Sequence, residues 1–353
     1  MASEAEVAAM RRAIQLALKP VISPRPNPRV GAVVLDASGR RIGQGFHRGP
    51  GTPHAEVVAL AAAGAAAAGG TVVVSLEPCK HLGRTGPCVS ALLAAGVRRV
   101  VYAQRDPNPL AAGGGAALAA AGVDVEGEVL ADEAAAANPA WTFAMLHRRP
   151  FVTWKFAATL DGRSAAADGS SQWITGPEAR RDVAQRRAEC DVVLVGTGTA
   201  LADDPRLTVR DEDDLPAPRE RQPLRVVMGY RVLPDDAALL DEAAPTLLLR
   251  THDPVQALEQ LFAGHERRHV WLEGGPTLAA NFVRAGVVDE VVAYVAPAIL
   301  GAGRSAVGDF GITRIADIVR LRLESVARVG DDVRLTMRRD LDSQVSTNQE
   351  GQA

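Results

Sequence analysis

Cysteine and aromatic residues are scarce in this sequence. Its 353 residues include three cysteines, and aromatic residues make up 4%. Three cysteines cannot all pair with one another, and a chain of this size has little need of disulfides in a reducing compartment. The sequence therefore favours metal binding or simple burial for its thiols. Cys190, which leads into the apolar run DVVLVG, is predicted to be a core residue.

Long apolar runs are also absent, which argues against a membrane protein. No stretch approaches the roughly 18 uninterrupted apolar residues that a transmembrane helix requires. The opening residues MASEAEVAAM lack the basic start and apolar stretch of a signal peptide. We therefore expect a cytoplasmic protein that does not bind membranes.

A strong excess of either charge is missing as well. The net charge is −3, with 15 Lys/Arg against 11 Asp/Glu in residues 1–150 and 24 against 31 in the rest. Neither part is basic enough for sequence-independent binding of nucleic acid, and no basic strip rich in aromatic residues is present. A nucleic-acid-binding module is therefore disfavoured, and no nucleic-acid partner is expected.

The length and the 47% hydrophobic content predict two α/β domains. In the first, helix and strand patterns alternate, which indicates a layered sheet. The expected helices are 7–18, one from residue 54, 88–95, 110–121 and 132–147. The expected strands are 71–75, 99–103, a short one near 123, and a hairpin formed by VGAVVLD and RIGQGFH.

The segment HRRPF at 147–151 is a plausible domain boundary, because a charged run and a proline follow a predicted helix. We expect domains at 1–147 and 148–341. The second domain begins with the β-rich stretch FVTWKFAATLDGR and then alternates again. Its predicted strands are 192–195, 224–228, 246–249, 269–272 and 290–295, and its helices are 177–187, 254–262 and 277–285. The polar residues 342–353 are predicted to form a disordered tail.

Three residues of the first domain have the chemistry of a zinc site. His54 stands in TPHAEVVAL, and Cys79 and Cys88 stand in LEPCKHLGRTGPC. A catalytic zinc site has three protein ligands and a fourth position for water. The plain alternative is a surface helix start and two buried cysteines. That alternative does not account for the order His-x-Glu, then Glu-Pro-Cys after a strand, then Pro-Cys at a helix start.

Glu56 is predicted to have a different role from these ligands. Residues two apart on a helix do not share a face, so Glu56 should not join His54 on the metal. From the first helical turn it could reach a metal-bound water and act as a proton shuttle. Zinc hydroxide with such a carboxylate is the chemistry of hydrolytic deamination of an amino-substituted heterocycle. One departure is that eight residues separate the cysteines, whereas the general signature is Cys-x-x-Cys.

The second domain contains two strand-turn-helix segments with glycine, VLVGTGTALADDP and VWLEGGPTLAANF. Backbone amides at such turns can bind phosphate, although ordinary α/β turns also use glycine. Lys155 in the strand FVTWKFA either lies on an exposed face or serves a site. Arg187 and Arg210 could bind phosphate or be solvated, and Glu273 could be a loop charge. The residues alone leave these alternatives open.

Taken together, the motifs resemble one family, the bifunctional riboflavin-biosynthesis deaminase/reductase, over nearly the whole chain. In the first part the matching stretches are PNPRVGAVV, HAEVVAL, LEPC with GRT and PC, and DPNP. In the second they are TLDGR, SQWITG, LADDPRLTVR, EGGPTLAANF and VDEVVAYVAPAILG. The eight-residue cysteine spacing is characteristic of this family.

This resemblance implies a cytidine-deaminase-like three-layer α/β/α domain followed by a dihydrofolate-reductase-like α/β domain. The first would hydrolyse the ring 2-amino group of the GTP-derived diamino-ribosylamino-pyrimidinone phosphate. The second would reduce the ribosyl group to ribityl with NADPH, and the enzyme would be a homo-oligomer, a dimer or tetramer. An alternative is a deaminase with a non-catalytic, nucleotide-binding second domain.

The resemblance also implies residue roles. His54, Cys79 and Cys88 correspond to the Zn²⁺ ligands and Glu56 to the proton donor. Cofactor contacts correspond to Ala158, Trp173, Thr199, Asp203, Gly275, Pro276, Thr277, Leu278, Ala279, Ala280 and Asn281. Substrate contacts in the reductase correspond to Ser171, Arg187, Leu207, Arg210 and Glu273, with Lys155 beside them.

The chain departs from the family pattern at two places. Family members commonly carry Ser-His-His and a second proline where this chain has Lys80, Leu82 and Gly86, which affects the shape of the deaminase loop. The segment from Met228 to Tyr230 lacks an Asp-Ser pair that is common there. One cofactor contact is therefore expected to differ.

Overall fold

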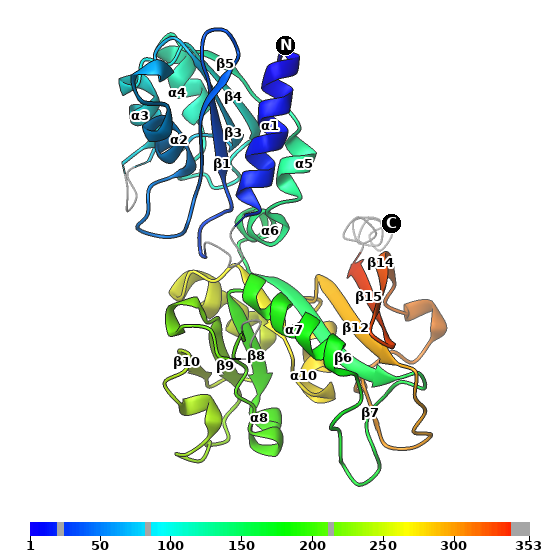
Figure 1. The fold of residues 1–353 in the computed structure, drawn as a ribbon. Coiled ribbons are helices and arrows are strands. Elements are labelled where there is room, and N and C mark those ends of the chain that lie inside the picture. The colour runs from blue at the N-terminus through cyan, green and yellow to red at the C-terminus, as the bar shows by residue number, and fades with distance from the viewer. Residues whose placement is uncertain (20–24, 82–85, 211–214, 340–353) are drawn as a thin grey trace, which may run out of the picture. The chain divides into compact units, whose positions relative to one another are not determined.

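The computed structural model of the chain describes residues 1–19, 25–81, 86–210 and 215–339. It separates into two compact units, Met1–Arg149 and Pro150–Ala353 (Figure 1). The predicted tail at 342–353 and the departure at Leu82 lie outside the described residues.

The first unit is a five-stranded sheet covered by helices on both faces (Figure 1). The strand order is β2-β1-β3-β4-β5; β1 is antiparallel to β2 and β3, and β3, β4 and β5 are parallel. The strands are β1 (Gly31–Leu35), β2 (Arg41–Phe46), β3 (Thr71–Leu76), β4 (Arg99–Gln104) and β5 (Asp124–Glu126). The helices are α1 (Glu4–Ala17), α2 (Ala55–Ala63), α3 (Cys88–Ala94), α4 (Gly114–Ala120), α5 (Ala131–Ala135) and α6 (Pro139–His147), with a 3₁₀ turn at Gly64–Ala67.

Alternate residues of the strands form the two faces, as the period of two in a β-strand requires. On one face Val72 and Val74 pack against α2, α3 and α4 through residues such as Leu92. On the other face Val73 packs against α1 and α5 through residues such as Met10. The expected three-layer α/β/α arrangement is confirmed.

The prediction of one helix over 132–147 is wrong, because α5 ends at Ala135 and α6 begins at Pro139. Proline cannot donate a backbone hydrogen bond and disfavours helical geometry in the residue before it. Asn138, the residue before Pro139, has φ −133° and is non-helical. Its side chain instead binds the backbone N–H of Arg29 at 2.7 Å and the carbonyl of Arg29 at 2.7 Å.

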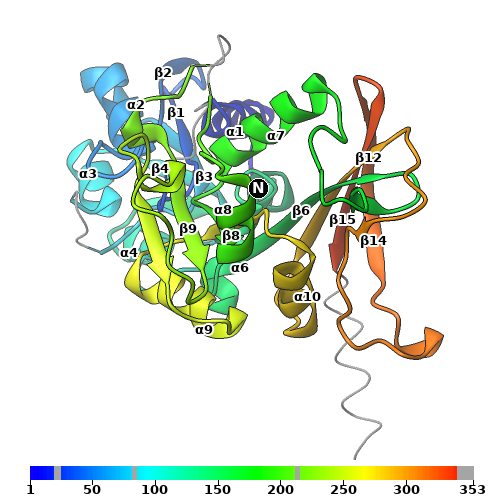
Figure 2. The ribbon, with the colours of Figure 1, turned by 90° about the horizontal axis from the view of Figure 1, so that it is seen from below.

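The second unit has an eight-stranded sheet in the order β10-β9-β8-β11-β6-β12-β15-β14. The first six strands in this order are mutually parallel, and β15 and β14 pair antiparallel beside β12 (Figure 2). The strands are β6 (Phe151–Thr159), β8 (Val192–Gly196), β9 (Leu224–Met228), β10 (Thr246–Leu249), β11 (His269–Leu272), β12 (Glu290–Ala296), β14 (Leu321–Val329) and β15 (Asp332–Arg339), while β7 (Arg163–Ala165) pairs separately with β13 (Arg304–Ser305).

The α-helices of this unit are α7 (Pro177–Glu189), α8 (Thr197–Asp203), α9 (Pro254–Glu259) and α10 (Pro276–Arg284). A π-helical turn, Gln260–Gly264, follows α9, and 3₁₀ turns lie at Arg219–Arg221, Ala238–Leu240 and Ile315–Asp317. Because β8, β9, β10 and β11 are parallel, their carboxyl ends all lie along the same side of the sheet, which we call its carboxyl edge. Ligands of open parallel sheets bind at this carboxyl edge.

The strands β14 and β15 were not predicted from the sequence, whereas α8 lies in VLVGTGTALADDP, where a strand, a turn and a helix start were predicted. The helix α8 is 7 residues long and begins directly after β8. In β14 most side chains are exposed, so no buried face imposes the alternation from which strands are predicted. These two strands extend the sheet beyond β12.

Candidate active sites

The predicted zinc ligands meet where three segments of the first unit converge. His54 is the N-cap of α2, Cys88 is the first residue of α3, and Cys79 follows β3. His54 Nδ1 lies 3.1 Å from Cys88 Sγ and 3.6 Å from Cys79 Sγ, and the three ligand atoms lie within 4.8 Å of one another. Tetrahedral zinc with bonds of about 2.1 and 2.3 Å places ligand atoms about 3.5–3.8 Å apart. The three residues therefore fit a zinc ion.

The electrostatics of this cluster favour a thiolate beside a cation. A hydrogen bond from Cys88 lowers the pKa of Cys79 to about 4. The hydrogen bond between His54 and Cys79 raises the pKa of His54. The backbone N–H of Cys88, at the start of α3, also points to Cys79 Sγ at 3.5 Å. Thiolate character is what zinc coordination requires of a cysteine.

Glu56 lies in the first turn of α2 and is 3% exposed. Burial raises the pKa of its carboxyl group, and a hydrogen bond with Cys88 places that group beside the ligand cluster. A carboxyl group with a raised pKa can take up and release a proton near neutral pH. This arrangement is compatible with the predicted proton shuttle, which stays a prediction.

His47 supports the ligand His54 and was not singled out from the sequence. Its ring lies edge-on to that of His54, with centroids 5.3 Å apart. His47 Nδ1 donates to the carbonyl of Pro53 at 3.2 Å, and Asn27 Nδ2 donates to His47 Nε2 at 2.9 Å. The stretch PNPRVG, which matches the family pattern, contains Asn27 and could have pointed to this contact. This chain of contacts fixes the segment that enters α2.

Glu77 organises the loop that carries Cys79, although no role for it was predicted from the sequence. Its carboxylate accepts the N–H groups of Gly113 at 3.1 Å, Gly115 at 3.0 Å and Asp106 at 3.2 Å. Gly114 is needed between them, since a Cβ there would lie 1.7 Å from the carbonyl oxygen of Pro78. Asp106 is buried, which raises its pKa to about 7. The loop that carries Cys79 is therefore hydrogen-bonded through Glu77 to the start of α4.

In the second unit, Lys155, Arg187 and Glu273 form one buried ionic cluster. Glu273 follows β11; Arg187 on α7 donates from Nε to its Oε1 and from Nη2 to Oε2 at 2.8 Å, and Lys155 Nζ on β6 lies 3.7 Å from Oε2. Trp271 Nε1 donates to the same carboxylate at 2.7 Å. Burial by itself would raise the pKa of Glu273. The positive charges of Arg187 and Lys155 have the larger effect and lower this pKa to about 2.

Burial lowers the pKa of Lys155, and Glu273 opposes this effect. The Lys155 side chain is 18% exposed. Of the two alternatives left open by the sequence, a solvated strand face is therefore excluded, and a role of this lysine in a site stays a prediction. An ammonium group that reaches a partly open surface from a sheet strand can contact a substrate.

The two glycine-bearing turns lie side by side, because they follow the neighbouring parallel strands β8 and β11. The N–H of Gly275 donates to Thr199 Oγ1 at 3.2 Å, which joins the start of α10 to α8. Gly275 has φ −64°, and a Cβ there would lie 3.5 Å from Thr199 Oγ1, an ordinary contact. Residues 275–281 therefore present the N-terminus of α10 at the carboxyl edge of the sheet, where backbone amides can bind phosphate.

The remaining predicted contacts lie on several different segments of this unit. Ala158 lies on β6 and is 2% exposed, while Ser171 and Trp173 lie on the segment between β7 and α7. Trp173 is 69% exposed, with Arg180 Cζ 4.5 Å from the centre of its ring. Asp203 is the last residue of α8 and is exposed.

Leu207 and Arg210 lie on the segment after α8. Leu207 packs its side chain in the apolar cluster with Val195 and Ala200, so this side chain is not available to a ligand. Arg210 is exposed, and its backbone pairs with that of Pro216.

Both departures from the family pattern have local effects. Lys80 is exposed, and its Nζ lies 2.9 Å from where a Cβ of Gly113 would stand. At the end of β9, Gly229 has φ +131°, and the 59% exposed ring of Tyr230 stacks on His252 with centroids 5.1 Å apart. An aromatic pair therefore lies at the end of β9, next to the segment where one cofactor contact was expected to differ.

Comparison with known proteins accounts for both units. The family model for the cytidine and deoxycytidylate deaminase zinc-binding region matches residues 3–104, and that for the RibD C-terminal domain matches 150–335. The riboflavin biosynthesis protein RibD of Mycobacterium tuberculosis is 50% identical over 313 residues, which cover 88% of this chain and 91% of the relative. This chain belongs to the RibD family.

Solved structures agree with this assignment. RibD of Acinetobacter baumannii matches with a TM-score of 0.89 and 38% identity, covering 96% of this chain and 99% of that one. A diaminohydroxyphosphoribosylaminopyrimidine deaminase/5-amino-6-(5-phosphoribosylamino)uracil reductase of Thermotoga maritima matches with a TM-score of 0.80 and 29% identity, over 95% and 99%. The expected domain folds are confirmed.

The family assignment also confirms the expected enzyme. A RibD protein is a bifunctional deaminase and reductase of riboflavin biosynthesis that uses Zn²⁺ and NADPH, and both domains are present here. The alternative of a second domain without chemistry is not favoured. Across the ranges that the structure describes, no helix combines the length and apolar character of a membrane span.

Proposed function

We propose that residues 1–147 deaminate the GTP-derived pyrimidine phosphate, with His54, Cys79 and Cys88 as zinc ligands and Glu56 as the proton carrier. The observation that supports this most directly is the convergence of the three ligand atoms within 4.8 Å next to the buried Glu56. When bound, zinc would supply a Lewis acid that lowers the pKa of water to about 7.

The chain's own part in this reaction is proton transfer and orientation. Glu56 takes a proton from the attacking water and delivers it to the ring nitrogen beside the carbon under attack. Glu56 then takes the second proton from the hydroxyl group that has been added to the ring carbon and gives it to the amino group. The carbon–nitrogen bond breaks, ammonia leaves, and the ring carbonyl forms. Its raised pKa suits a group that must be protonated and deprotonated within one turnover.

Metal analysis tests the ligand assignment. The purified chain should contain one zinc, and Cys88→Ser should lose it together with ammonia release. Cys190→Ser is the matched control, because Cys190 is an equally buried thiol that donates to the carbonyl of Arg186 in the other unit. A metal-free wild-type preparation that still deaminates would refute the proposal.

We further propose that residues 148–341 form the reductase domain. The compact units divide between Arg149 and Pro150, two residues beyond the proposed boundary, and the C-terminal family model starts at 150. In this proposal the turns at Thr199, Asp203 and 275–281 bind NADPH together with Ala158 and Trp173. The ribosyl phosphate is held by Arg210, with Ser171, the Leu207 backbone and the Lys155, Arg187 and Glu273 cluster around the sugar.

Kinetics with each reductase substrate varied in turn separate these two roles. Gly275→Val should raise the KM for NADPH, because Gly275 has an ordinary backbone conformation and ordinary contacts, so that the added bulk projects toward the ligand. Arg210→Ala should raise the KM for the pyrimidine phosphate by about 10- to 100-fold with little effect on NADPH, as a lost charge-assisted contact costs about 1.5–3 kcal/mol. Equal weakening of both ligands by Arg210→Ala would contradict the assignment.

The same proposal includes the setting of the enzyme. We place it in the cytoplasm, because its three cysteines form no disulfide and two of them belong to the proposed zinc site. We also propose that it is a homo-oligomer, a dimer or tetramer. The edge strand β14 supports this, since it exposes Leu323 by 56% and Val326 by 60%. Exposed apolar side chains on an unpaired sheet edge favour association.

A further inference from the structure

The segment from Asp204 to Arg210 holds an uncommon backbone conformation. Asp204 has φ +36° and Leu207 has φ +51°, so two non-glycine residues adopt the left-handed region. Such conformations are sparsely populated and persist where the surroundings impose them. The surroundings here are two buried polar side chains, Gln222 and Arg225, which precede or belong to β9.

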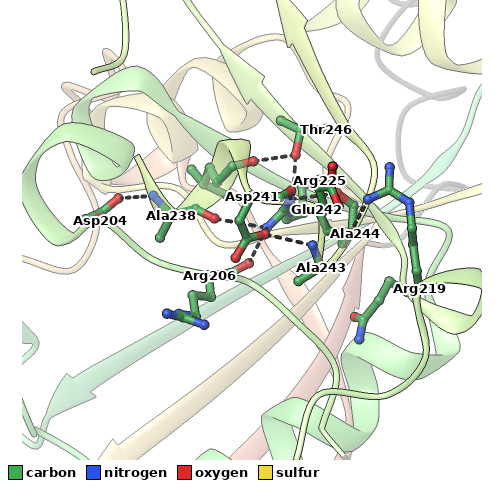
Figure 3. Close-up of polar contacts among 12 residues, drawn as sticks. Asp204, Arg206, Arg219, Arg225, Ala238, Asp241, Glu242, Ala243, Ala244 and Thr246 are labelled. Atoms are coloured by element: carbon green, nitrogen blue, oxygen red, sulfur yellow. Dashed lines mark hydrogen bonds and ion pairs between the residues drawn. The ribbon is translucent and has the colours of Figure 1, made fainter. Parts of the chain in front are cut away.

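Arg225 is completely buried, and its guanidinium group points to the segment and to the turn before β10 (Figure 3). Nη1 donates to the carbonyl of Arg206 at 3.3 Å, which is the contact with the segment. The other acceptors are Ala238 O at 3.2 Å, Asp241 Oδ1 at 2.9 Å, Asp241 O at 2.8 Å, Ala244 O at 2.6 Å and Thr246 Oγ1 at 2.9 Å. One guanidinium group therefore ties two loops together.

A second bond joins the same two loops. Asp204 Oδ1 accepts the N–H of Ala238 at 2.8 Å (Figure 3). The segment is thus held at Asp204 and Arg206 to the turn that Arg225 also binds.

Gln222 holds the other end of the segment and is 6% exposed. Its Oε1 accepts the N–H of Val209 at 2.7 Å, and its Nε2 donates to the carbonyls of Val209 at 3.0 Å and Ala217 at 2.7 Å. The amide thus binds both backbone groups of the residue directly before Arg210. Since Ala217 directly follows Pro216, the backbone partner of Arg210, both sides of this bridge are fixed.

We propose that Gln222 and Arg225 are positioning residues for the reduction step. By fixing the backbone from Asp204 to Val209, they set the direction in which Arg210 leaves the segment and the orientation of the Leu207 backbone. A buried charge is weak evidence for stability, because an apolar side chain of similar volume often serves as well. Most of the acceptors of the Arg225 guanidinium group are loop carbonyls, so this group fixes the geometry of the loops. The inference rests on the proposed substrate role of Arg210.

Kinetic measurements on full-length variants test this inference. In Gln222→Glu the side chain keeps its shape, but carboxylate oxygens face the carbonyls of Val209 and Ala217. In Arg225→Met the volume is kept and every donor is lost. Each variant should raise the KM for the pyrimidine phosphate in reduction about tenfold. This factor corresponds to the loss of one hydrogen bond between the displaced segment and the substrate. The KM for NADPH should change less than twofold, and deamination in the same samples should be unchanged.

Asp191→Asn is the matched control. Asp191 is 4% exposed and accepts the N–H groups of Arg268 and His269, but it precedes β8 at the amino edge of the sheet. It should lower the thermal midpoint and leave both KM values unchanged. If Gln222→Glu and Arg225→Met do not fold, Gln222→Asn replaces them, because it keeps the amide on a side chain one methylene shorter. The KM for the pyrimidine phosphate is again compared with the KM for NADPH.

The outcomes separate this inference from the proposed function. If Arg210→Ala raises the substrate KM and the Gln222 and Arg225 variants only lower the thermal midpoint, as Asp191→Asn does, the positioning role is refuted. If Arg210→Ala itself leaves the substrate KM unchanged, the substrate role of the segment is wrong, and the positioning role is refuted with it.

Discussion

Glu273 compensates two positive charges in the reductase unit, because its carboxylate contacts both Arg187 and Lys155. Its side chain is 8% exposed and also accepts the indole N–H of Trp271. Removing one member of a buried ionic group leaves the others uncompensated, which costs about 3–5 kcal/mol. The cluster therefore matters for folding as well as for substrate contact.

We predict that Glu273→Gln lowers the free energy of unfolding of the reductase unit at pH 7 by about that amount. The pKa of Glu273 is lowered from 4.5 to about 2 in the folded chain. Its stabilising contribution is therefore fully present above pH 4.5 and is lost as the pH falls toward 2. Urea unfolding should show a difference between wild type and variant that shrinks over this range.

Glu178→Gln is the surface control for this measurement. Glu178 pairs with Arg181 at 2.7 Å, but their side chains are 46% and 70% exposed. Exposed pairs contribute about 0–1 kcal/mol. A comparable loss in both variants would contradict the stabilising role of the buried cluster.

At the scale of helices and strands, β14 presents an apolar edge that none of the residues described by the structure covers. Val326 and Leu323 are exposed on it, and Ile315, before the strand, is 83% exposed. We predict that Val326→Lys shifts the native mass toward the monomer in light scattering, because a lysine on a sheet edge opposes pairing. Deamination should be retained. A wild-type mass equal to one chain would refute the proposed oligomer.

The sequence predicted those elements whose apolar pattern is set by burial. The parallel strands β8 and β11 are buried on both faces, and their stretches VVLV and VWL are continuous apolar runs, while β9 departs from this pattern only at Arg225. The strand β14 escaped prediction because most of its side chains are exposed, and the α5–α6 break escaped because Pro139 was read as part of a longer helix.

The site was predictable to a similar degree. Order and spacing identified His54, Cys79 and Cys88, and the structure brings them together. Contacts between distant segments, such as Thr199 with Gly275 or Arg225 with Arg206, have no local signature in the sequence. The choice between an exposed strand face and a site role for Lys155 also depends on Glu273, which is distant in the sequence.

At the scale of the whole molecule, two chemistries belong to two separate compact units. Each unit has its own apolar core: one of the clusters in the first unit includes Val72 and Leu92, and one in the second includes Leu194 and Phe282. The residues proposed for each reaction all lie within one unit. Loss of one activity should therefore leave the other intact when its substrate is supplied.

Glu56→Gln tests this account most directly, because the amide keeps the shape of the side chain and cannot carry the proton. Ammonia release from the diamino pyrimidine phosphate and NADPH oxidation with supplied deaminated substrate would be followed separately, together with zinc content. The account predicts retained zinc, ammonia release lowered at least about 100-fold, and an unchanged rate of reduction. Near-wild-type ammonia release by this variant would contradict it.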